Sequence, residues 1–447
     1  MEPVELARKI VTTLKSSGHL AYFVGGCVRD VLLGGEPKDY DVATDARPDQ
    51  ITALFPYSGL VGAHFGVVLV REQGAQVEVA TFRSDHGYAD GRHPAGVNFE
   101  TDPRLDVLRR DFTINALLLD PDRDEVLDFV GGRDDLRNRL IRAIGDPEAR
   151  FREDHLRLLR AVRFASRLDY QIEPATFDAI GRLHGLIITV SAERVRDELV
   201  RILTEGGARR GFELLDATGL LSDFLPEIAA MKGVAQPPEY HPEGDVWTHT
   251  LLLLENLRNP SATLALGALL HDVGKPPTFR VADRIRFDGH VEKGVEMASV
   301  ILNRLRFSND EIRQVLALVA NHMRFKDAPQ MKVSTLKRFL RLENFPEHLE
   351  LHRLDCVSSH GHLENYELVR QSMQELPEEQ LKPEPLITGA DLIAAGYRPG
   401  PAFARILAAV EDAQLESKIQ NTEAAMALVR AQFRIPDGSP TGTGRPA

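Results

Sequence analysis

The sequence predicts an α+β fold, in which a head built on a mixed sheet with helices is followed by all-α segments. Short apolar runs with the length of strands, such as residues 21–24 and 76–81, alternate with helical stretches over the first 130 or so residues. From about residue 135 onward, apolar residues recur at helical spacing almost throughout. A chain of 447 residues with 43% hydrophobic content can bury several cores, so we expect about three or four domains.

Stretches rich in Pro and Gly divide the chain into expected segments, with joints at 236–245 and 381–385. The segments are a head at 1–135, a helical neck at 136–235, a helical body at 236–365, a helical tail at 366–435 and a disordered end at 436–447. In the head we expect a helix at 3–17 and strands at 21–24, 39–42, 66–70, 76–81, 117–119 and 125–129.

Composition indicates a cytoplasmic protein. The two cysteines form no CxxC pair, and the amino terminus carries acids where a secretory signal would carry basic and then apolar residues. No apolar run approaches the roughly 18 residues needed to cross a bilayer, so a membrane span is excluded. Oligomeric state cannot be predicted from these features.

The formal charge of -12 hides a local excess of arginine. Residues 137–167 contain nine arginines and no lysine, against four acids. A solvated helical face would usually mix Lys with Arg, whereas Arg suits bidentate recognition of phosphates and bases. We therefore expect this segment to bind a polyanion.

Two aspartates, Asp39 and Asp41, lie at i and i+2 of an expected strand and so project from one face. Such a pair opposite a triphosphate forms the oxygen-rich site that Mg²⁺ prefers. Metal ions held there would activate a 3′ hydroxyl and neutralise the departing pyrophosphate. Glu78, on a neighbouring strand, is a third candidate carboxylate or an ordinary exposed strand residue.

A strand, a Gly25-Gly26 turn and a helix bearing Arg29 precede these aspartates. Glycines let backbone amides approach a phosphate at a helix amino terminus, and Arg29 would add a charged clamp. Many such turns bind nothing, so the motif gains weight only from the aspartates beside it.

These motifs together resemble the class II tRNA nucleotidyltransferases, the CCA-adding enzymes and their bacterial poly(A) polymerase relatives. The resemblance covers roughly residues 20–205 and is carried by Gly25-Gly26-Cys27-Val28-Arg29-Asp30, Asp39-Tyr40-Asp41, Arg109-Arg110-Asp111-Phe112-Thr113-Ile114-Asn115-Ala116, the stretch from Asp128 to Leu136, and Glu153-Asp154-His155-Leu156-Arg157. It implies a polymerase-β-like head, then a neck that binds RNA and the nucleotide base, a body and a tail.

The resemblance also implies roles for individual residues. Gly26 and Arg29 match triphosphate contacts, and Asp39 and Asp41 match magnesium ligands. Arg110, Asp111 and Asn115 match groups that hold the sugar and phosphates of the incoming nucleotide. From the residues alone, the Arg-Arg-Asp cluster has a competing interpretation as a buried ion network.

Base choice can be argued from chemistry. Cytosine and adenine each present an amino donor beside a ring-nitrogen acceptor, which fits a carboxylate beside a guanidinium. Asp154 and Arg157 lie one turn apart on a predicted helix, so they can supply this pair, although a plain i,i+3 salt bridge is the alternative. Arg160 and Arg163 continue the same face as phosphate or base contacts.

The expected activity is therefore template-independent addition of C, C and A to the tRNA 3′ end, from CTP and ATP and with Mg²⁺. CC-adding relatives are expected to lack a flexible loop that residues 82–94 supply here, and residues 62–67 resemble the CCA-adding form. A-only addition, polyadenylation and a catalytically silent RNA-binding protein are the alternatives.

A second motif resembles the HD phosphohydrolase superfamily. His249, the pair His271-Asp272 and a later Asp355 would bind a second divalent metal that activates water. This implies possible phosphatase or cyclic phosphodiesterase chemistry, which could even be the main activity; vestigial ligands in a supporting scaffold are the alternative.

Overall fold

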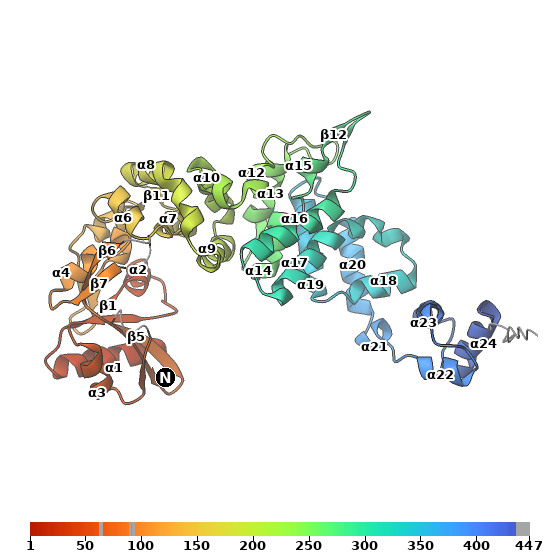
Figure 1. Ribbon diagram of the computed structural model, residues 1–447, viewed down its shortest axis with the longest axis horizontal. Helices are drawn as coiled ribbons and strands as arrows, with labels where there is room; N and C mark the ends of the chain where they lie inside the picture. The colour runs from red at the N-terminus through yellow and green to blue at the C-terminus, as the bar shows by residue number, and fades with distance from the viewer. Residues whose placement is uncertain (62–65, 89–90, 92–93, 435–447) are drawn as a thin grey trace, which may run out of the picture. The chain divides into compact units, whose positions relative to one another are not determined.

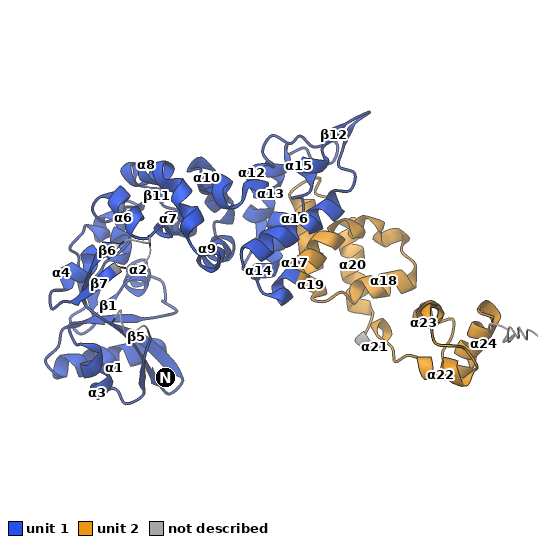
Figure 2. Cartoon of the chain, viewed as in Figure 1, with its two compact units in different colours: residues 1–312 blue, residues 313–447 orange. Residues whose placement is uncertain are grey.

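The computed structural model describes residues 1–61, 66–88, 91 and 94–434. It divides into two compact units, residues 1–312 and 313–447, which are coloured blue and orange in Figure 2. The boundary falls inside the predicted 236–365 segment. The five-part division expected from sequence is finer than these two units and stays a prediction, and its last part, 436–447, lies outside the described residues.

A seven-stranded mixed sheet forms the head, in the red and orange part of Figure 1. Its order is β3-β4-β5-β2-β1-β8-β9, in which β2 and β5 pair in parallel and the other neighbours pair antiparallel. The strands are β1 (Ala21–Val24), β2 (Asp41–Thr44), β3 (Ser58–Leu60), β4 (Val67–Glu72), β5 (Ala75–Thr81), β8 (Leu118–Asp120) and β9 (Glu125–Leu127).

Helix α1 (Pro3–Ser16) packs on the head sheet and leaves Glu78 of β5 outside the buried apolar face. Helix α1 buries Leu6, Ile10 and Leu14, because apolar residues recur along one of its faces, and it packs on β1, β2 and β5. Strand β5 alternates, with Val77 and Val79 buried and the residues between them less so. The two-residue period therefore turns Glu78 away from that buried face.

A hairpin follows β5, formed by β6 (Arg83–Tyr88) and β7 (Pro94–Phe99). The sequence predicted a loop over 82–94, and this is wrong for the six residues that form β6. Residues 89–90 and 92–93 of that predicted loop, and 62–65 of the family-typing stretch 62–67, lie outside the described residues.

Helices make up most of the rest of the first unit. In the head they are α2 (Gly26–Leu32), α3 (Pro48–Leu54), α4 (Pro103–Leu108), η2 (Thr113–Asn115) and α5 (Gly132–Arg137). Next come α6 (Pro147–Glu153), α7 (Arg157–Leu168), α8 (Pro174–Leu183), η3 (His184–Thr189), α9 (Ala192–Thr204), α10 (Ala208–Ala217), α11 (Leu220–Phe224) and α12 (Pro226–Ala229). The last are α13 (Val246–Asn256), α14 (Ala262–Leu270), α15 (Lys275–Thr278) and α16 (His290–Arg304). Two small pairs, β10 (Leu140–Ile141) with β11 (Gln171–Ile172) and β12 (Arg280–Val281) with β13 (Ile285–Arg286), connect them.

The second unit is helical throughout its described part. It begins within α17 (Asn309–Asn321) and continues with η4 (His322–Gln330), α18 (Val333–Leu340), α19 (Phe345–Val357), α20 (Glu364–Glu375), α21 (Glu378–Leu381), α22 (Gly389–Ala394), α23 (Pro401–Leu415) and α24 (Thr422–Gln432). One apolar cluster centres on Phe325, Phe339 and Phe345, and another on Ile406 and Val410. Lys337 joins α18 to the end of α23 by donating to the Leu415 carbonyl oxygen at 2.9 Å.

The predicted fold class is confirmed, since a mixed-sheet head precedes helical segments. One strand matters for the site. The sequence placed it at 39–42, but β2 begins at Asp41 and ends at Thr44. Asp39 therefore precedes the strand, and the argument that Asp39 and Asp41 share a strand face is wrong.

Candidate active site

Three carboxylates gather near the start of β2. The parallel register of β2 and β5 sets Asp41 beside Glu78, and Asp39 lies two residues before the strand. The Asp41 side chain keeps contact with solvent, yet the surrounding protein raises its pKa to about 6, chiefly by desolvation and then by repulsion from Glu78, with a smaller contribution from Asp39. Arg110 opposes this shift. A carboxylate that is disfavoured in its charged form by its neighbours gains most from a divalent cation, so this cluster fits one.

The turn before α2 keeps the approach to Asp41 open. Gly25 has φ 82°, which side chains rarely allow, and a Cβ there would lie 3.7 Å from Arg110 Nη1 and 3.9 Å from Asp41 Oδ2. Arg29, in the last turn of the short helix α2, is buried; its Nη1 donates to Asn115 Oδ1 at 2.6 Å and its Nε to Asp30 Oδ1 at 2.8 Å. Arg29 and Asn115, which the sequence assigned separately, are thus brought together.

Arg110 is held by a carboxylate that sequence reasoning missed. Asp106, on α4, is buried and accepts from Arg110 Nη2 at 2.8 Å and from Arg109 Nη2 at 2.6 Å. Burial alone would raise the pKa of Asp106, but the two arginines hold it below its usual value. Because one buried anion orients two guanidinium groups, the expected ion network is present around Arg110.

Asp111 belongs to a second network that joins the head to α7. Its Oδ2 accepts from Arg160 Nε at 2.9 Å and Nη2 at 2.5 Å, and Asn115 Nδ2 donates to its other oxygen at 3.3 Å. Burial opposes ionisation, but Arg160 outweighs it and brings the Asp111 pKa to about 2. The Asp111 carboxylate therefore stays charged. Its contact with Arg160 fits the alternative interpretation from sequence, a buried ion network.

Asp154 and Arg157 do not share a helix, contrary to the sequence prediction. Asp154 is extended, with φ -141° and ψ 106°, after the end of α6, and Arg157 opens α7. The Asp154 carboxylate accepts from Arg194 Nη2 at 2.8 and 3.0 Å. Arg157 donates to Glu153 at 2.7 Å and to the carbonyl oxygens of Arg150 and Arg109 at 2.9 and 3.0 Å. Both side chains nevertheless line one pocket.

Farther along α7, Arg163 is nearly buried. Its Nε donates to Glu198 Oε2 at 2.6 Å, and its guanidinium lies 4.2 Å from the centre of the Phe164 ring. Arg29 and Arg160 each lie 5.3 Å from the same ring. Phe164 thus gathers three arginines through cation–π contacts.

Sequence reasoning missed Asp106, Arg194 and Glu198. Glu198 carried a usable signal, because it occupies an apolar position of α9 beside the buried Val195 and Leu199. A carboxylate in such a position requires a cationic partner. Arg194 gave no comparable signal, since nothing local distinguishes it from a solvated arginine.

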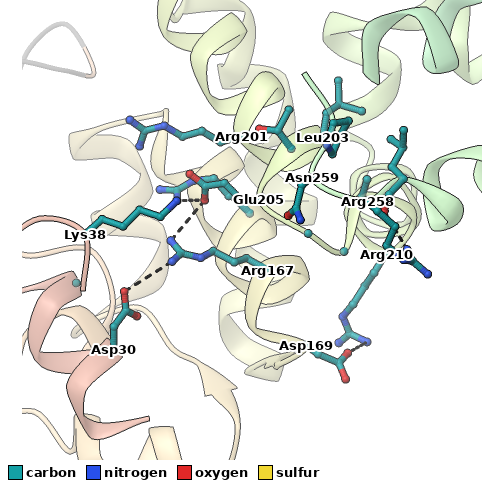
Figure 3. Close-up of a pocket in the computed structure, with 18 of the residues that line it drawn as sticks. Asp30, Lys38, Arg167, Asp169, Arg201, Leu203, Glu205, Arg210, Arg258 and Asn259 are labelled. Atoms are coloured by element: carbon teal, nitrogen blue, oxygen red, sulfur yellow. Dashed lines mark hydrogen bonds and ion pairs between the residues drawn. The ribbon is translucent and has the colours of Figure 1, made fainter. Parts of the chain in front are cut away.

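The predicted residues line two neighbouring cavities in the first unit. A pocket of about 440 Å³ is lined by Gly26, Arg29, Asp41, Arg110, Asp111, Asn115, Asp154, Arg157, Arg160 and Arg163, among others. A larger cleft of about 1190 Å³ shares Gly26, Arg29, Asp41 and Arg163 and adds Asp39 (Figure 3 shows part of its lining). Glu78 lines neither of these cavities. It lies beside Asp41 through the pairing of β2 with β5.

A histidine cluster lies in the same unit, near α13 and α14. His249 Nε2 is 3.3 Å from His271 Nε2, and Asp272 Oδ2 is 3.1 Å from His271 Nε2 and 3.9 Å from His249 Nε2. All three side chains are buried. His290 Nε2 lies 4.0 Å from Asp272 Oδ1. Asp355 lies on α19 in the second unit. Within the first unit, His241, Glu243 and His249 lie close enough together to bind a metal ion.

Comparisons with known proteins place this geometry in a family. Family models match as "Poly A polymerase head domain" at residues 21–142, "Probable RNA and SrmB- binding site of polymerase A" at 169–232 and tRNA nucleotidyltransferase domain 2 at 290–429. The CCA-adding enzyme of Levilactobacillus brevis is 32% identical over 428 residues, which cover 95% of this chain and 97% of that protein. The chain belongs to the CCA-adding enzyme family. The CCA-adding enzyme of Limosilactobacillus reuteri agrees, with 33% identity over 425 residues that cover 93% and 94% of the two chains.

Solved structures of this family have the same fold. The Bacillus stearothermophilus CCA-adding enzyme, solved in complex with CTP, matches with a TM-score of 0.74 and 28% identity over 96% of this chain and 98% of that one. The Thermotoga maritima CCA-adding enzyme matches with a TM-score of 0.59 at 19% identity, over 96% and 94% of the two chains, and supports the fold alone.

The expected family and enzyme class are therefore confirmed, and the protein is a nucleotidyltransferase. The HD-type interpretation of the histidines stays a prediction, as do the individual site roles. None of the described helices is long and apolar enough to cross a membrane.

Because Glu78 and Asp39 repel the charge of Asp41, we predict that Asp41→Asn stabilises the metal-free protein. Because the folded-state pKa of Asp41, about 6, exceeds its ordinary value of 3.8, ionisation of Asp41 destabilises the folded state as pH rises through this range. Allowing for solvent screening of an exposed group, we expect a gain of about 1 kcal/mol at pH 7. The gain should shrink as pH falls below 6. Urea unfolding in EDTA at pH 7 and pH 5 measures it.

Glu125→Gln, which neutralises an exposed acid of β9, is the matched control and should change stability little at either pH. A lower stability of Asp41→Asn than of the parent at pH 7 would contradict the crowding argument.

Proposed function

We propose that this chain adds C, C and A to the 3′ end of tRNA from CTP and ATP, and that Asp39 and Asp41 hold Mg²⁺ during the transfer. One observation carries the proposal: Asp41, at the carboxylate cluster, lines the same pocket as Asp154 and Arg157, the candidate base-reading pair. The similar proteins support the choice of CTP and tRNA as substrates, because they are CCA-adding enzymes and one was solved in complex with CTP.

The residues around Asp41 suit the handling of a triphosphate. Bound Mg²⁺ would supply charge neutralisation of phosphate oxygens and would lower the pKa of the attacking hydroxyl. Asp41 is ionised at neutral pH, with a pKa of about 6, so it can serve as a ligand. Gly25 and Gly26 keep side chains out of the approach, while Arg110, oriented by Asp106, turns its positive charge toward Asp41.

Base selection follows from hydrogen-bond capacity. Asp154 accepts from Arg194 Nη2 and from the Leu156 backbone N–H, which leaves lone-pair capacity on Oδ2 for the amino group of cytosine or adenine. Arg157 uses three of its five N–H groups on Glu153 and two backbone carbonyls, which leaves two for a ring nitrogen. Uracil and guanine present a carbonyl and an N–H instead, which would leave Asp154 facing an acceptor.

Two buried cysteines without a disulfide, Cys27 and Cys356, support the proposed cytoplasmic location. Full CCA addition is preferred to A-only addition or polyadenylation because the relatives of nearly equal length are CCA-adding enzymes.

The activity is tested with tRNAs that end at the discriminator base, at C and at CC, each offered CTP, ATP or both. We expect one complete CCA end and no further extension, read by sequencing the products. Asp41→Ala should reduce transfer by at least about 1000-fold, since metal-held charge supplies several kcal/mol, while tRNA binding stays near the parent value. Glu125→Gln is again the control. Long A tracts, or no CTP incorporation, would refute CCA addition, and substantial turnover by Asp41→Ala would refute the metal assignment.

Nucleotide choice should depend on Asp154. Asp154→Asn replaces an acceptor by a group that also donates, so we expect the preference for CTP over UTP to fall about 10- to 100-fold. Glu148→Gln, at a carboxylate of α6 that accepts from Arg182 and does not line this pocket, should retain the preference. The ratio of kcat/KM for the two nucleotides measures both, and an unchanged ratio in Asp154→Asn would show that Asp154 does not contact the base.

A second candidate function, a divalent-metal phosphohydrolase centre, is favoured by the ring orientations of three histidines. Nδ1 faces an acceptor in each: the Ala268 carbonyl oxygen at 2.9 Å for His271, the Phe287 carbonyl oxygen at 2.9 Å for His290, and Glu243 Oε1 at 2.7 Å for His249. An acceptor at Nδ1 fixes the tautomer and leaves Nε2 as the metal-ligating atom. In all three, Nε2 lies within 4.0 Å of an Asp272 oxygen. Asp355 remains a proposed further ligand.

The centre is tested by metal content and by phosphate-ester hydrolysis. The protein should retain about one Mn²⁺ or Co²⁺ per chain after gel filtration and should open a 2′,3′-cyclic phosphate, and His271→Ala should lose both. His184→Ala, at a half-exposed histidine paired with Asp223, is the control. Equal metal retention by the parent and His271→Ala would leave only a structural role for the cluster.

A further inference from the structure

The larger cleft contains cations beyond those near the carboxylate cluster. Its basic residues are Arg29, Lys38, Arg163, Arg167, Arg201, Arg209, Arg210 and Arg258. They come from the segment before β2, from α2, α7, α9 and α10, and from the residues after α13 (Figure 3). Their ion pairs divide them into two groups.

Most of these arginines are already bound by carboxylates. Arg167 lies 3.7 Å from Asp30 and 3.5 Å from Glu205, as Figure 3 shows. Arg209 donates to Glu255 at 2.6 Å, and Arg210 Nη1 lies 3.3 Å from Asp169 Oδ1. Such contacts neutralise the charge of these guanidinium groups and hold the helices together.

Lys38, Arg201 and Arg258 differ, and we call them the open cations. Among residues 1–61, 66–88, 91 and 94–434, none of the three has a carboxylate partner. Lys38 immediately precedes Asp39, and Arg201 lies near the end of α9. Arg258 donates through Nη1 to the carbonyl oxygens of Glu255 and Leu257, at 2.7 and 2.9 Å, which fix its side chain at the end of α13. Three unneutralised cations in one cleft attract an anion more strongly than the paired ones do.

The start of α10 adds hydrogen-bond donors to the same wall. Gly206 and Gly207 line the cleft, and Gly207 has φ 72° as the residue before the helix. A Cβ on Gly207 would lie 2.2 Å from the Ser166 carbonyl oxygen, so only glycine allows α10 to begin this close to α7. The first amides of a helix have no intrahelical partner, and they favour phosphate.

The extent of the open cations argues against a single nucleotide as their ligand. Arg201 lines both cavities, whereas Lys38 and Arg258 line the larger cleft but not the pocket with Asp154 and Arg157. That pocket, of about 440 Å³, lies within the range of about 300–1000 Å³ typical of small-molecule sites, whereas the cleft of about 1190 Å³ exceeds it. A ligand that reaches from Lys38 to Arg258 carries its negative charge along its length, as a nucleic acid strand does.

We propose that Lys38, Arg201 and Arg258, with the start of α10, bind the backbone phosphates of the last nucleotides of the RNA strand that is extended. This inference rests on the proposed function, because the RNA 3′ end must reach the carboxylate cluster beside Lys38. The family model described as a probable RNA-binding site matches residues 169–232. This range includes Arg201 and the start of α10, but neither Lys38 nor Arg258. Phosphate contacts fix the position of the RNA strand but do not depend on its base sequence.

The first experiment separates RNA binding from nucleotide binding. Arg201→Gln, Arg258→Gln and Lys38→Gln are compared with Arg123→Gln, a control at an exposed arginine between β8 and β9 that lines neither cavity. Affinity for a tRNA lacking CCA is measured without nucleotide at several salt concentrations. Each open-cation variant should weaken binding about three- to tenfold and reduce the slope of log Kd against log salt by about one. Affinity for CTP should stay within about twofold of the parent in Lys38→Gln and Arg258→Gln, since neither residue lines the smaller pocket. Arg201 lines both cavities, so Arg201→Gln is judged by its tRNA affinity and salt slope alone.

The second experiment locates the phosphates. The same tRNA is prepared with neutral methylphosphonate linkages at its last two internucleotide positions. This change should weaken binding to the parent but should have little added effect on the Arg201→Gln, Arg258→Gln double variant, because the lost contacts are the same ones. Independent, multiplying effects of the two changes would place these arginines elsewhere on the RNA and would overturn the proposal.

Two other outcomes would also overturn it. Loss of CTP affinity with unchanged tRNA affinity would assign the open cations to the triphosphate, and unchanged affinity for both would exclude the cleft from binding. Because these measurements need no turnover, they are distinguishable from failure of the proposed activity, which appears as an absence of CCA ends in the parent protein.

Discussion

The contact between Asp111 and Arg160 is the interaction on which the candidate active site depends. It joins the segment after α4 to α7, through two hydrogen bonds of 2.9 and 2.5 Å to one carboxylate oxygen. Arg157 makes a second connection between the same elements by donating to the Arg109 carbonyl oxygen. Asp111 is buried and Arg160 is partly exposed, so loss of Arg160 would leave a buried carboxylate without its main cationic partner. These bonds therefore fix the distance between the sheet, which carries Asp41, and α7, beside which the candidate base site lies.

Charge is distributed unevenly around this connection, and the distribution separates residues engaged in ion pairs from residues whose charge is not balanced by a neighbour. Asp106 and Asp111 each face arginines and have lowered pKa values, whereas Asp41 faces other carboxylates and has a raised one. The same contrast holds for cations: Arg163 is satisfied by Glu198, while Arg201 has no carboxylate partner within the described ranges. Paired groups hold the fold, and groups left with repulsion or open charge are the ones that gain from metal or phosphate.

Fixed partners also orient the side chains of the histidine cluster. A backbone carbonyl lies at hydrogen-bond distance from one nitrogen of His271 and of His290, and Glu243 Oε1 lies 2.7 Å from His249 Nδ1, so the other nitrogen of each ring can turn toward Asp272. Lys275 also contacts Asp272, at 2.6 Å, and limits its negative charge. The rings are therefore oriented before any ligand is present, which lowers the entropic cost of binding a metal.

The sequence by itself determined the fold class, the family and most of the residues that line the smaller pocket. It could do so because strand and helix periods, and motifs such as Gly25-Gly26 and Asp39-Tyr40-Asp41, are local properties of the chain. The tertiary structure alone decided that β2 begins at Asp41, that a break separates Asp154 from Arg157, and which arginines are neutralised. These depend on partners such as Glu198 and Arg194, which lie tens of residues away from the groups they bind. No local pattern specifies such long-range pairing, because it is set by how α7 and α9 pack.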